Sequence, residues 1–175
     1  MAKILIIYSS TDGQTRRICD RLREVIASAD HDVEMVAIED CPAQPLADYD
    51  RIVVGARIRY GKHAPEVLRF IRDNAKLLNA GPHAFFSVNV VARKPEKNRP
   101  ETNPYVVKLL KQIPWRPREV EVFAGRIEYA RYGFLDRQMI RFIMWITKGP
   151  TALDTVAEFT NWGRVEAFGR RLARF

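Results

Sequence analysis

The sequence contains little cysteine and no long hydrophobic run, and both shortages narrow the classes of protein it can belong to. Cys19 and Cys41 are the only cysteines among 175 residues, and neither has neighbours at metal-ligand spacing. We therefore expect reduced structural thiols in the cytoplasm, no disulfide framework and no metal site. No apolar run is long enough to span a bilayer, and Lys3 stands directly before a strand-like segment without a small-residue cleavage site, which argues against a signal peptide.

The motifs that most often identify nucleotide and phosphate chemistry are missing as well. No Gly-Lys-Ser/Thr follows the first apolar segment, so a Walker loop is excluded, and the spaced glycines of a dinucleotide fingerprint are absent. A receiver-like binding module needs an acidic pair after its first strand and an aspartate after its third. This chain has Ser9-Ser10 and Gly55-Ala56 at those positions, which disfavours a receiver.

What the chain does contain near its start is an apolar segment that gives way abruptly to a polar loop. Residues 4–7 (ILII) are typical of a strand buried on both faces of a parallel sheet. Apolar residues at helical spacing follow between 18 and 29, so residues 9–15 link a buried strand to a helix N-terminus. The free N–H groups and the positive end of the helix dipole favour an anion there, and the loop hydroxyls can donate to phosphate oxygens.

This loop has hydroxyls but no lysine, which suits a phosphate monoester that is bound and not transferred. Its spacing resembles the flavodoxin loop that holds the phosphate of flavin mononucleotide (FMN), and a glycine lets the backbone approach the ligand. An ordinary capping loop is the alternative, because Ser, Thr and Asp are favoured N-cap residues of any helix. The predicted phosphate site consists of Ser9, Ser10, Thr11, Asp12, Gly13, Gln14 and Thr15.

Strand-like and helix-like segments alternate along the rest of the chain. Predicted strands cover 33–38, 51–56, 83–91 and 120–127; predicted helices cover 64–78, 104–110 with Asn103 as N-cap, and the segment after the N-cap Asn161. This pattern predicts an α/β fold in a single domain over 1–175, namely a flavodoxin-like, doubly wound parallel sheet of five strands in the order 2-1-3-4-5. In that order the loops at 9–15, 57–63 and 87–94 converge on one crevice at the carboxyl ends of the strands.

About thirty residues, from 130 to roughly 159, exceed what a minimal flavodoxin needs before its last helix. Within them, segment 134–148 predicts a cationic amphipathic helix that lies in a membrane interface, covers a hydrophobic ligand, or packs on the domain's own core. Residues 157–160 are predicted to resume the fifth strand. The apolar face of the helix carries Leu135, Met139, Phe142, Ile143 and Ile146, widened by Met144 and Trp145, and the basic face carries Arg137, Arg141 and Lys148.

Positive charge is in clear excess, with 29 Lys and Arg against 21 Asp and Glu, a formal net charge of +8 and a pI near 9.8. An electron carrier of the flavodoxin type is more often acidic, so the excess favours another partner, such as an anionic lipid surface or an acidic substrate. A basic surface that merely keeps the protein soluble is the alternative. Nucleic-acid binding has nothing but the net charge in its favour, and we do not predict it.

Three segments turn the flavodoxin-like pattern into a family resemblance: SVNVVARKPEK at 87–97, STDGQT at 10–15 and IRYG at 58–61. Together they resemble the bacterial menaquinone-dependent protoporphyrinogen IX dehydrogenases, the flavodoxin-like protoporphyrinogen oxidases of haem biosynthesis. The resemblance covers nearly the whole chain. It implies non-covalently bound FMN, oxidation of protoporphyrinogen IX with six electrons passing to three membrane quinones (menaquinone or ubiquinone), and a peripheral location on the cytoplasmic face of the bacterial inner membrane.

The resemblance and the predicted crevice suggest roles for individual residues. Because flavin carries the redox step, no protein acid-base triad is required and no catalytic residue is assigned. Tyr60 is the candidate to stack on the isoalloxazine, and Asn89 either bonds the polar edge of the ring or caps the strand end. The residues expected to flank the ring are Ile58, Arg59, Tyr60, Gly61, Ser87, Val88, Asn89, Val90 and Val91.

The substrate implied by the resemblance is a flexible apolar macrocycle with two propionates, so its site needs apolar contact and one or two cations. Arg93 and Lys94 are the candidate cations, with a solvent-exposed charge run as the alternative. His63 lies in a predicted flavin-facing loop, where it could assist proton movement, whereas His31 and His83 are expected to be structural or exposed. The alternative function is a flavodoxin-type FMN electron carrier, which should be acidic and lack the 130–159 segment.

Overall fold

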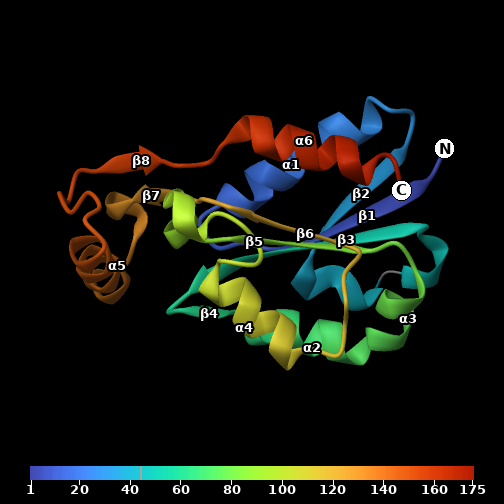
Figure 1. Ribbon diagram of the computed structural model, residues 1–175, viewed down its shortest axis with the longest axis horizontal. Helices are drawn as coiled ribbons and strands as arrows, with labels where there is room; N and C mark the ends of the chain where they lie inside the picture. The colour runs from blue at the N-terminus through green and yellow to red at the C-terminus, as the bar shows by residue number, and fades with distance from the viewer. Residues whose placement is uncertain (44) are drawn as a thin grey trace.

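A parallel sheet of five strands lies at the centre of the computed structural model, which describes residues 1–43 and 45–175 (Figure 1). The strands are β1 (Lys3–Ser9), β2 (Asp32–Ala37), β3 (Arg51–Arg59), β5 (Ala84–Val88) and β6 (Glu119–Phe123). They lie in the order β2-β1-β3-β5-β6, and every neighbouring pair in this row is parallel. Counted along the chain, this is the predicted order 2-1-3-4-5, so the predicted flavodoxin-like α/β fold is confirmed.

Helices cover both faces of the sheet. α1 (Gln14–Ala27) and α6 (Trp162–Leu172) lie together on one face, whereas α2 (Pro65–Asp73), α3 (Ala75–Ala80) and α4 (Pro104–Gln112) lie on the other (Figure 1). Successive side chains of a strand point to opposite faces, so Ile4 and Ile6 pack into the α1–α6 core, and Leu5 and Ile7 pack into the other core. All four are fully buried, as the continuous apolar run predicted.

The predicted N-caps are present, but one predicted helix is interrupted. The side-chain oxygen of Asn103 accepts from two backbone N–H groups of α4, at 3.2 and 3.3 Å, and that of Asn161 accepts from one of α6, at 3.1 Å. The helix predicted over 64–78 is instead divided into α2 and α3, because Asn74 leaves the helical conformation. The Asn74 amide donates to the carbonyl of Phe70 at 2.9 Å, a local side-chain bond that competes with helix continuation.

The prediction of one strand over 120–127 is wrong in its second half. The strand ends at Phe123, and β7 (Arg126–Glu128) instead pairs antiparallel with β8 (Val156–Glu158) in a separate ribbon. Residues 157–160 therefore do not resume the fifth strand.

Other strand boundaries shift where the chain turns. β3 runs beyond the predicted 51–56 because its end forms a hairpin with β4 (Lys62–His63). The strand predicted over 83–91 stops at Val88, since a 3₁₀ turn follows almost at once. The short 3₁₀ helices of the connections are η1 (Ile38–Ala43), η2 (Leu46–Asp48), η3 (Val90–Arg93), η4 (Pro95–Lys97) and η5 (Tyr129–Arg131).

Helix α5 (Phe134–Ile146) projects at the carboxyl end of the sheet, between β7 and β8 in the chain (Figure 1). It is the helix predicted in the 130–159 segment, and its own arginines attach it to neighbouring backbone. Arg137 donates to the carbonyl of Tyr129 at 3.0 Å, and Arg141 donates to that of Thr151 at 2.8 Å. Two of the three residues predicted on its basic face, Arg137 and Arg141, therefore hold the helix in place.

The apolar residues of α5 are divided between interior and solvent. Met144 is fully buried beside Ile127 and Tyr129, whereas Leu135 and Phe142, predicted on the same face, are 77% and 59% exposed. The helix thus packs partly on its own domain and still presents a large apolar surface outward. In the described residues, no helix is long and apolar enough to cross a membrane.

The close packing of β3 against β5 gives a stability prediction at Gly55. A Cβ atom at this position would lie 2.3 Å from Cζ of Phe86, whose buried ring packs edge-on against Phe123 and Phe168. We expect Gly55→Ala to lower the free energy of unfolding by about 1–3 kcal/mol, because the ring cannot move without disturbing its neighbours. Urea denaturation measures this change.

Gly133→Ala is the matched control. Gly133 has a φ of −61°, and a Cβ there would meet no atom within 4 Å. We expect the urea midpoint of this variant to stay close to that of the unaltered protein. An equal effect of the two substitutions, or none at Gly55, would contradict the packing explanation.

Candidate functional site

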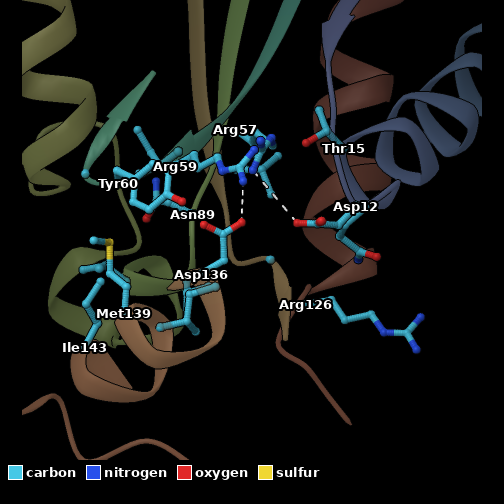
Figure 2. A pocket seen from close by; sticks show the side chains of 18 of the residues that line it. Asp12, Thr15, Arg57, Arg59, Tyr60, Asn89, Arg126, Asp136, Met139 and Ile143 are labelled. Carbon is cyan, nitrogen blue, oxygen red and sulfur yellow. Dashed lines mark hydrogen bonds and ion pairs between the residues drawn. The ribbon is translucent and has the colours of Figure 1, made fainter. Parts of the chain in front are cut away.

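A cavity lies at the carboxyl ends of β1, β3 and β5, with α5 along one side (Figure 2). The three loops predicted to converge at 9–15, 57–63 and 87–94 all contribute to its wall, together with α5. The predicted site residues that line it are Ser10, Asp12, Gln14, Thr15, Ile58, Arg59, Tyr60, Gly61, Val88, Asn89, Val90 and Val91.

Four other predicted residues lie outside the lining of this cavity. Ser9 ends β1 and is buried beside Ala56, and Ser87 is fully buried in β5. Thr11 accepts a hydrogen bond from Arg57, and the N–H of Gly13 donates to the hydroxyl of Ser10 at 3.2 Å. Ser9 and Ser87 are therefore buried in the sheet, and Thr11 and Gly13 make contacts within and beside the first loop.

The N-terminus of α1 is open to an anion. Its N-cap is Gly13, which has a φ of 86° and no side chain to cap the helix, whereas α4 and α6 are capped by asparagines. The first turn contains no acidic residue, so the orphan N–H groups keep their positive potential. The hydroxyls of Ser10 and Thr15 line the cavity beside it.

The side chain of Gln14 connects this loop to the β7–β8 ribbon. Its side-chain amide donates to a carboxylate oxygen of Glu158 and to the hydroxyl of Thr160, both at 2.9 Å. Thr160 in turn donates to the carbonyl of Ala124 at 2.7 Å. The side chain of Gln14 is therefore engaged by the protein, and its backbone N–H belongs to the open end of α1.

A tight turn places Tyr60 at the mouth of the cavity. Tyr60 and Gly61 have φ values of 50° and 70° and connect β3 to β4, as the central residues of a type I′ hairpin turn. A tyrosine with positive φ is rare and is most often found where the position serves a function. Its ring is half exposed, and the guanidinium of Arg59 lies 5.2 Å from the ring centre.

Asn89 holds the third loop in place. Its Oδ1 accepts from the N–H of Ala92 and from the side-chain amide of Asn103, both at 3.0 Å, and the residue is buried. Of the two roles predicted for Asn89, the structure shows a capping role, at the start of η3. Asn103 also donates to the carbonyl of Lys97 at 2.9 Å, so one buried amide pair fixes the 87–97 segment against α4.

The candidate substrate cations, Arg93 and Lys94, do not line the cavity. Arg93 donates to the carbonyl and the hydroxyl of Thr147, at 2.8 and 2.9 Å, and so attaches the end of α5 to the third loop. This corrects the prediction for Arg93. Its donors reach Thr147 across a long stretch of chain, and no local pattern signals such a contact.

The cations that do line the cavity are Arg57, Arg59 and Arg126. Figure 2 shows Arg57 and Arg59 between Asp12 of the first loop and Asp136 of α5. Arg57 lies 3.9 Å from Asp12, burial lowers its pKa, and Arg59 forms an ion pair with Asp136. Sequence reasoning assigned no role to Arg57, Arg126 or Asp136. For Arg57, the sequence did offer a signal: it stands two residues before Arg59, and side chains two residues apart on a strand point to the same face.

Helix α5 supplies the apolar part of the wall. Met139, Ile140, Ile143 and Met144 line the cavity together with valines of the third loop, one of which, Val90, packs against the cluster that contains Met144. Three of them, Met139, Ile143 and Met144, were predicted on the apolar face. Tyr105 and Tyr132, for which no role was predicted, also line the cavity.

The three histidines are structural. His63 is buried outside the cavity lining, its Nε2 lies 2.9 Å from the hydroxyl of Ser87, and burial lowers its pKa to about 4. It is therefore neutral near pH 7, and its position corrects the prediction of a proton-moving residue. His83 accepts from the N–H of Ile52 at 2.9 Å. His31 accepts from the N–H of Ala2 and lies 2.8 Å from the carbonyl of Ala173, joining the two ends of the chain.

This arrangement fits FMN. An uncapped helix N-terminus with hydroxyls and a guanidinium suits a phosphate dianion, and the apolar wall with Tyr60 at its edge suits a flat aromatic ring. The residues present can bind and orient such a cofactor. When bound, the flavin itself supplies the one- and two-electron redox chemistry.

Comparisons with known proteins agree with the fold. Residues 5–154 match the flavodoxin domain family. Flavodoxin 1 of Bacillus cereus superposes with a TM-score of 0.57 at 18% identity, covering 99% of this chain and 98% of that one. A flavodoxin of Streptococcus pneumoniae TIGR4 gives a TM-score of 0.55, also at 18% identity, with 99% of both chains covered.

The fold and the crevice thus define a flavodoxin-type oxidoreductase with FMN as its cofactor. Sequence similarity is more specific. The chain is 39% identical over 171 residues to the protoporphyrinogen IX dehydrogenase (quinone) of Escherichia coli K12, covering 98% of this chain and 94% of that one. It is 40% identical to the Leishmania major protein of the same name, and the match covers 98% of this chain and 74% of that one. The chain belongs to the protoporphyrinogen IX dehydrogenase (quinone) family.

The buried His63 predicts a pH dependence of stability. Its pKa is about 4 in the folded protein and about 6.5 when unfolded, so between these pH values the unfolded chain binds more protons. The free energy of unfolding should therefore fall as the pH falls from about 6.5 to 4, by on the order of 2–3 kcal/mol from this residue. The variant His63→Gln keeps a hydrogen-bonding group near Ser87. In this variant, the part of the pH dependence of the unfolding free energy that comes from His63 should vanish.

Urea denaturation at several pH values between 4.5 and 7.5 measures the slope. His31→Gln serves as control, because it removes another structural histidine and leaves His63 in place. A slope in His63→Gln as steep as in the unaltered protein would show that other groups cause the acid sensitivity.

Proposed function

We propose that this chain oxidises protoporphyrinogen IX to protoporphyrin IX, with FMN as the redox group and a membrane quinone as electron acceptor, as a step of haem biosynthesis. The observation that carries the proposal is the position of α5, whose apolar residues line the same cavity as the phosphate loop. A plain electron carrier needs no such wall. The 39% identity to a quinone-dependent dehydrogenase over nearly the whole chain supports it further.

The chemistry of the substrate suits the residues that line the cavity. Protoporphyrinogen is a large apolar macrocycle with two propionates, so it needs an apolar wall and a small number of cations. Met139, Ile140 and Ile143 provide apolar contact, and Arg59 provides positive charge. The protein's task is to hold the macrocycle near the flavin and to exclude water, while Asn89 and Gln14 keep the loops in place.

Arg59 is our candidate for a propionate-binding residue. Its side chain is 45% exposed and pairs with Asp136 on α5, whose side chain is 20% exposed. A guanidinium binds a carboxylate of either origin in the same planar geometry, so a propionate can take the place of Asp136. This exchange places one end of the macrocycle at the junction of β3 and α5.

A flavodoxin-type FMN electron carrier is the second candidate function. The similarity in fold to two flavodoxins favours it. The net charge of +8 and the exposed apolar residues of α5 disfavour a carrier that works between soluble proteins.

We further propose a peripheral location on the cytoplasmic face of the inner membrane, with the outer face of α5 in the lipid interface. The exposed apolar residues of this helix form a surface that a water-soluble partner would not require, and Lys148 stands exposed at its end. A quinone would reach the cavity directly from such a position. The residues of this surface are Phe134, Leu135, Phe142, Trp145 and Ile146.

Quinone-dependent oxidation of protoporphyrinogen by the purified protein tests the activity. We expect porphyrin fluorescence to rise with the quinone present, and Arg59→Met to raise KM for protoporphyrinogen about tenfold or more with a smaller change in kcat. Arg72→Met, which removes an exposed arginine of α2 outside the cavity lining, is the control. A preparation that binds FMN but leaves protoporphyrinogen unoxidised would favour the electron carrier.

Vesicle flotation tests the lipid surface. We expect the protein to float with vesicles that contain phosphatidylglycerol, less so at high salt, and Phe142→Asp to abolish flotation without loss of FMN. Gln112→Asp adds the same charge to an exposed position of α4, outside this apolar surface, and it should still float. Equal losses in both variants would assign the effect to charge rather than to apolar contact.

A further inference from the structure

The phosphate loop faces a cation that its hydroxyl pattern did not predict. Arg57 lies on β3, donates a hydrogen bond to the hydroxyl of Thr11 and stands 3.9 Å from the carboxylate of Asp12 (Figure 2). Its side chain is only 17% exposed, against 45% for Arg59. A largely enclosed guanidinium therefore forms part of the cavity wall at the phosphate loop.

Arg57 has few hydrogen-bonding partners for an arginine side chain that is largely enclosed. The group carries five N–H donors. Within residues 1–43 and 45–175, Arg57 makes a hydrogen bond with Thr11 and an ion pair with Asp12 at the outer limit of such a contact. A buried charge is stable where it is both paired and hydrogen-bonded, so donors of Arg57 remain for an anion in the cavity.

A phosphate at the N-terminus of α1 would use those donors. Guanidinium N–H groups match phosphate oxygens in pairs, and such charge-assisted bonds are among the strongest in proteins. Asp12 places a negative charge on the same loop, which by itself repels a phosphate dianion. The guanidinium beside Asp12 offsets that repulsion.

We propose that Arg57 is a phosphate-binding residue of the FMN site and the main source of this chain's preference for FMN over riboflavin. The loop hydroxyls and the end of α1 offer partial charges, whereas Arg57 adds a full positive charge. The inference rests on the FMN site and is independent of the porphyrinogen substrate.

The other cavity arginines have different partners. Arg59 pairs with Asp136 of α5, and Nη2 of Arg126 lies 3.2 Å from a carboxylate oxygen of Glu128. Arg57 is thus the cavity arginine whose side chain contacts the phosphate loop.

Titration of the flavin-free protein with FMN and with riboflavin, followed by flavin fluorescence, tests the assignment. We expect Arg57→Met to weaken FMN binding about 10- to 100-fold and to change riboflavin binding by less than about twofold, because only FMN carries the phosphate. Arg57→Lys should keep part of the FMN affinity, since it retains the charge and loses the paired geometry. Arg72→Met should bind both flavins as the unaltered protein does.

An equal loss for the two flavins in Arg57→Met would reduce Arg57 to a structural role, and unchanged FMN binding would overturn the inference. If Arg57→Met does not fold, Arg57→Gln decides, because it removes the charge and keeps a polar side chain; an FMN-to-riboflavin affinity ratio equal to that of the unaltered protein would exclude the phosphate contact. No porphyrinogen is present in these titrations. A chain that passes them and fails to oxidise protoporphyrinogen would disprove the proposed function and leave this inference standing.

Discussion

The parallel register of β1, β3 and β5 is the constraint on which the site depends. Ser9 pairs with Ala56, and Ala56 pairs with Ser87, so three residues form one row across the sheet. Because the strands run in the same direction, the chain leaves the sheet beyond this row at three adjacent points. Arg57 follows Ala56 directly, which brings it opposite the loop that begins after Ser9.

The second constraint is the attachment of α5, because an apolar helix outside the main sheet needs fixed anchors to form a wall. Arginines supply them: Arg93, Arg137 and Arg141 all donate to backbone carbonyls around the helix. Charged donors to buried carbonyls hold a helix without covering its apolar faces. One face of α5 can therefore line the cavity while the opposite face remains exposed.

Much of the fold followed from local patterns in the sequence. The apolar run at 4–7 marked a strand buried on both faces, and Asn103 and Asn161 marked two helix starts, because burial and capping depend on neighbours a few residues away. The same kind of reasoning failed at Asn74 and after Phe123. There a side-chain bond to a nearby carbonyl and pairing with a strand from much later in the chain decided the outcome.

By itself, the sequence determined the strand order and the family, because alternating segments and spaced motifs can be recognised from residue types alone; it also located the predicted phosphate loop. The tertiary structure alone decided what each polar side chain bonds. Arg93 looked free for a substrate and is engaged by Thr147, whereas Arg57 attracted no prediction and faces the phosphate loop. The physical reason is that a long flexible side chain takes its partners from whatever the fold brings within a few ångströms, and those residues lie far away in the chain.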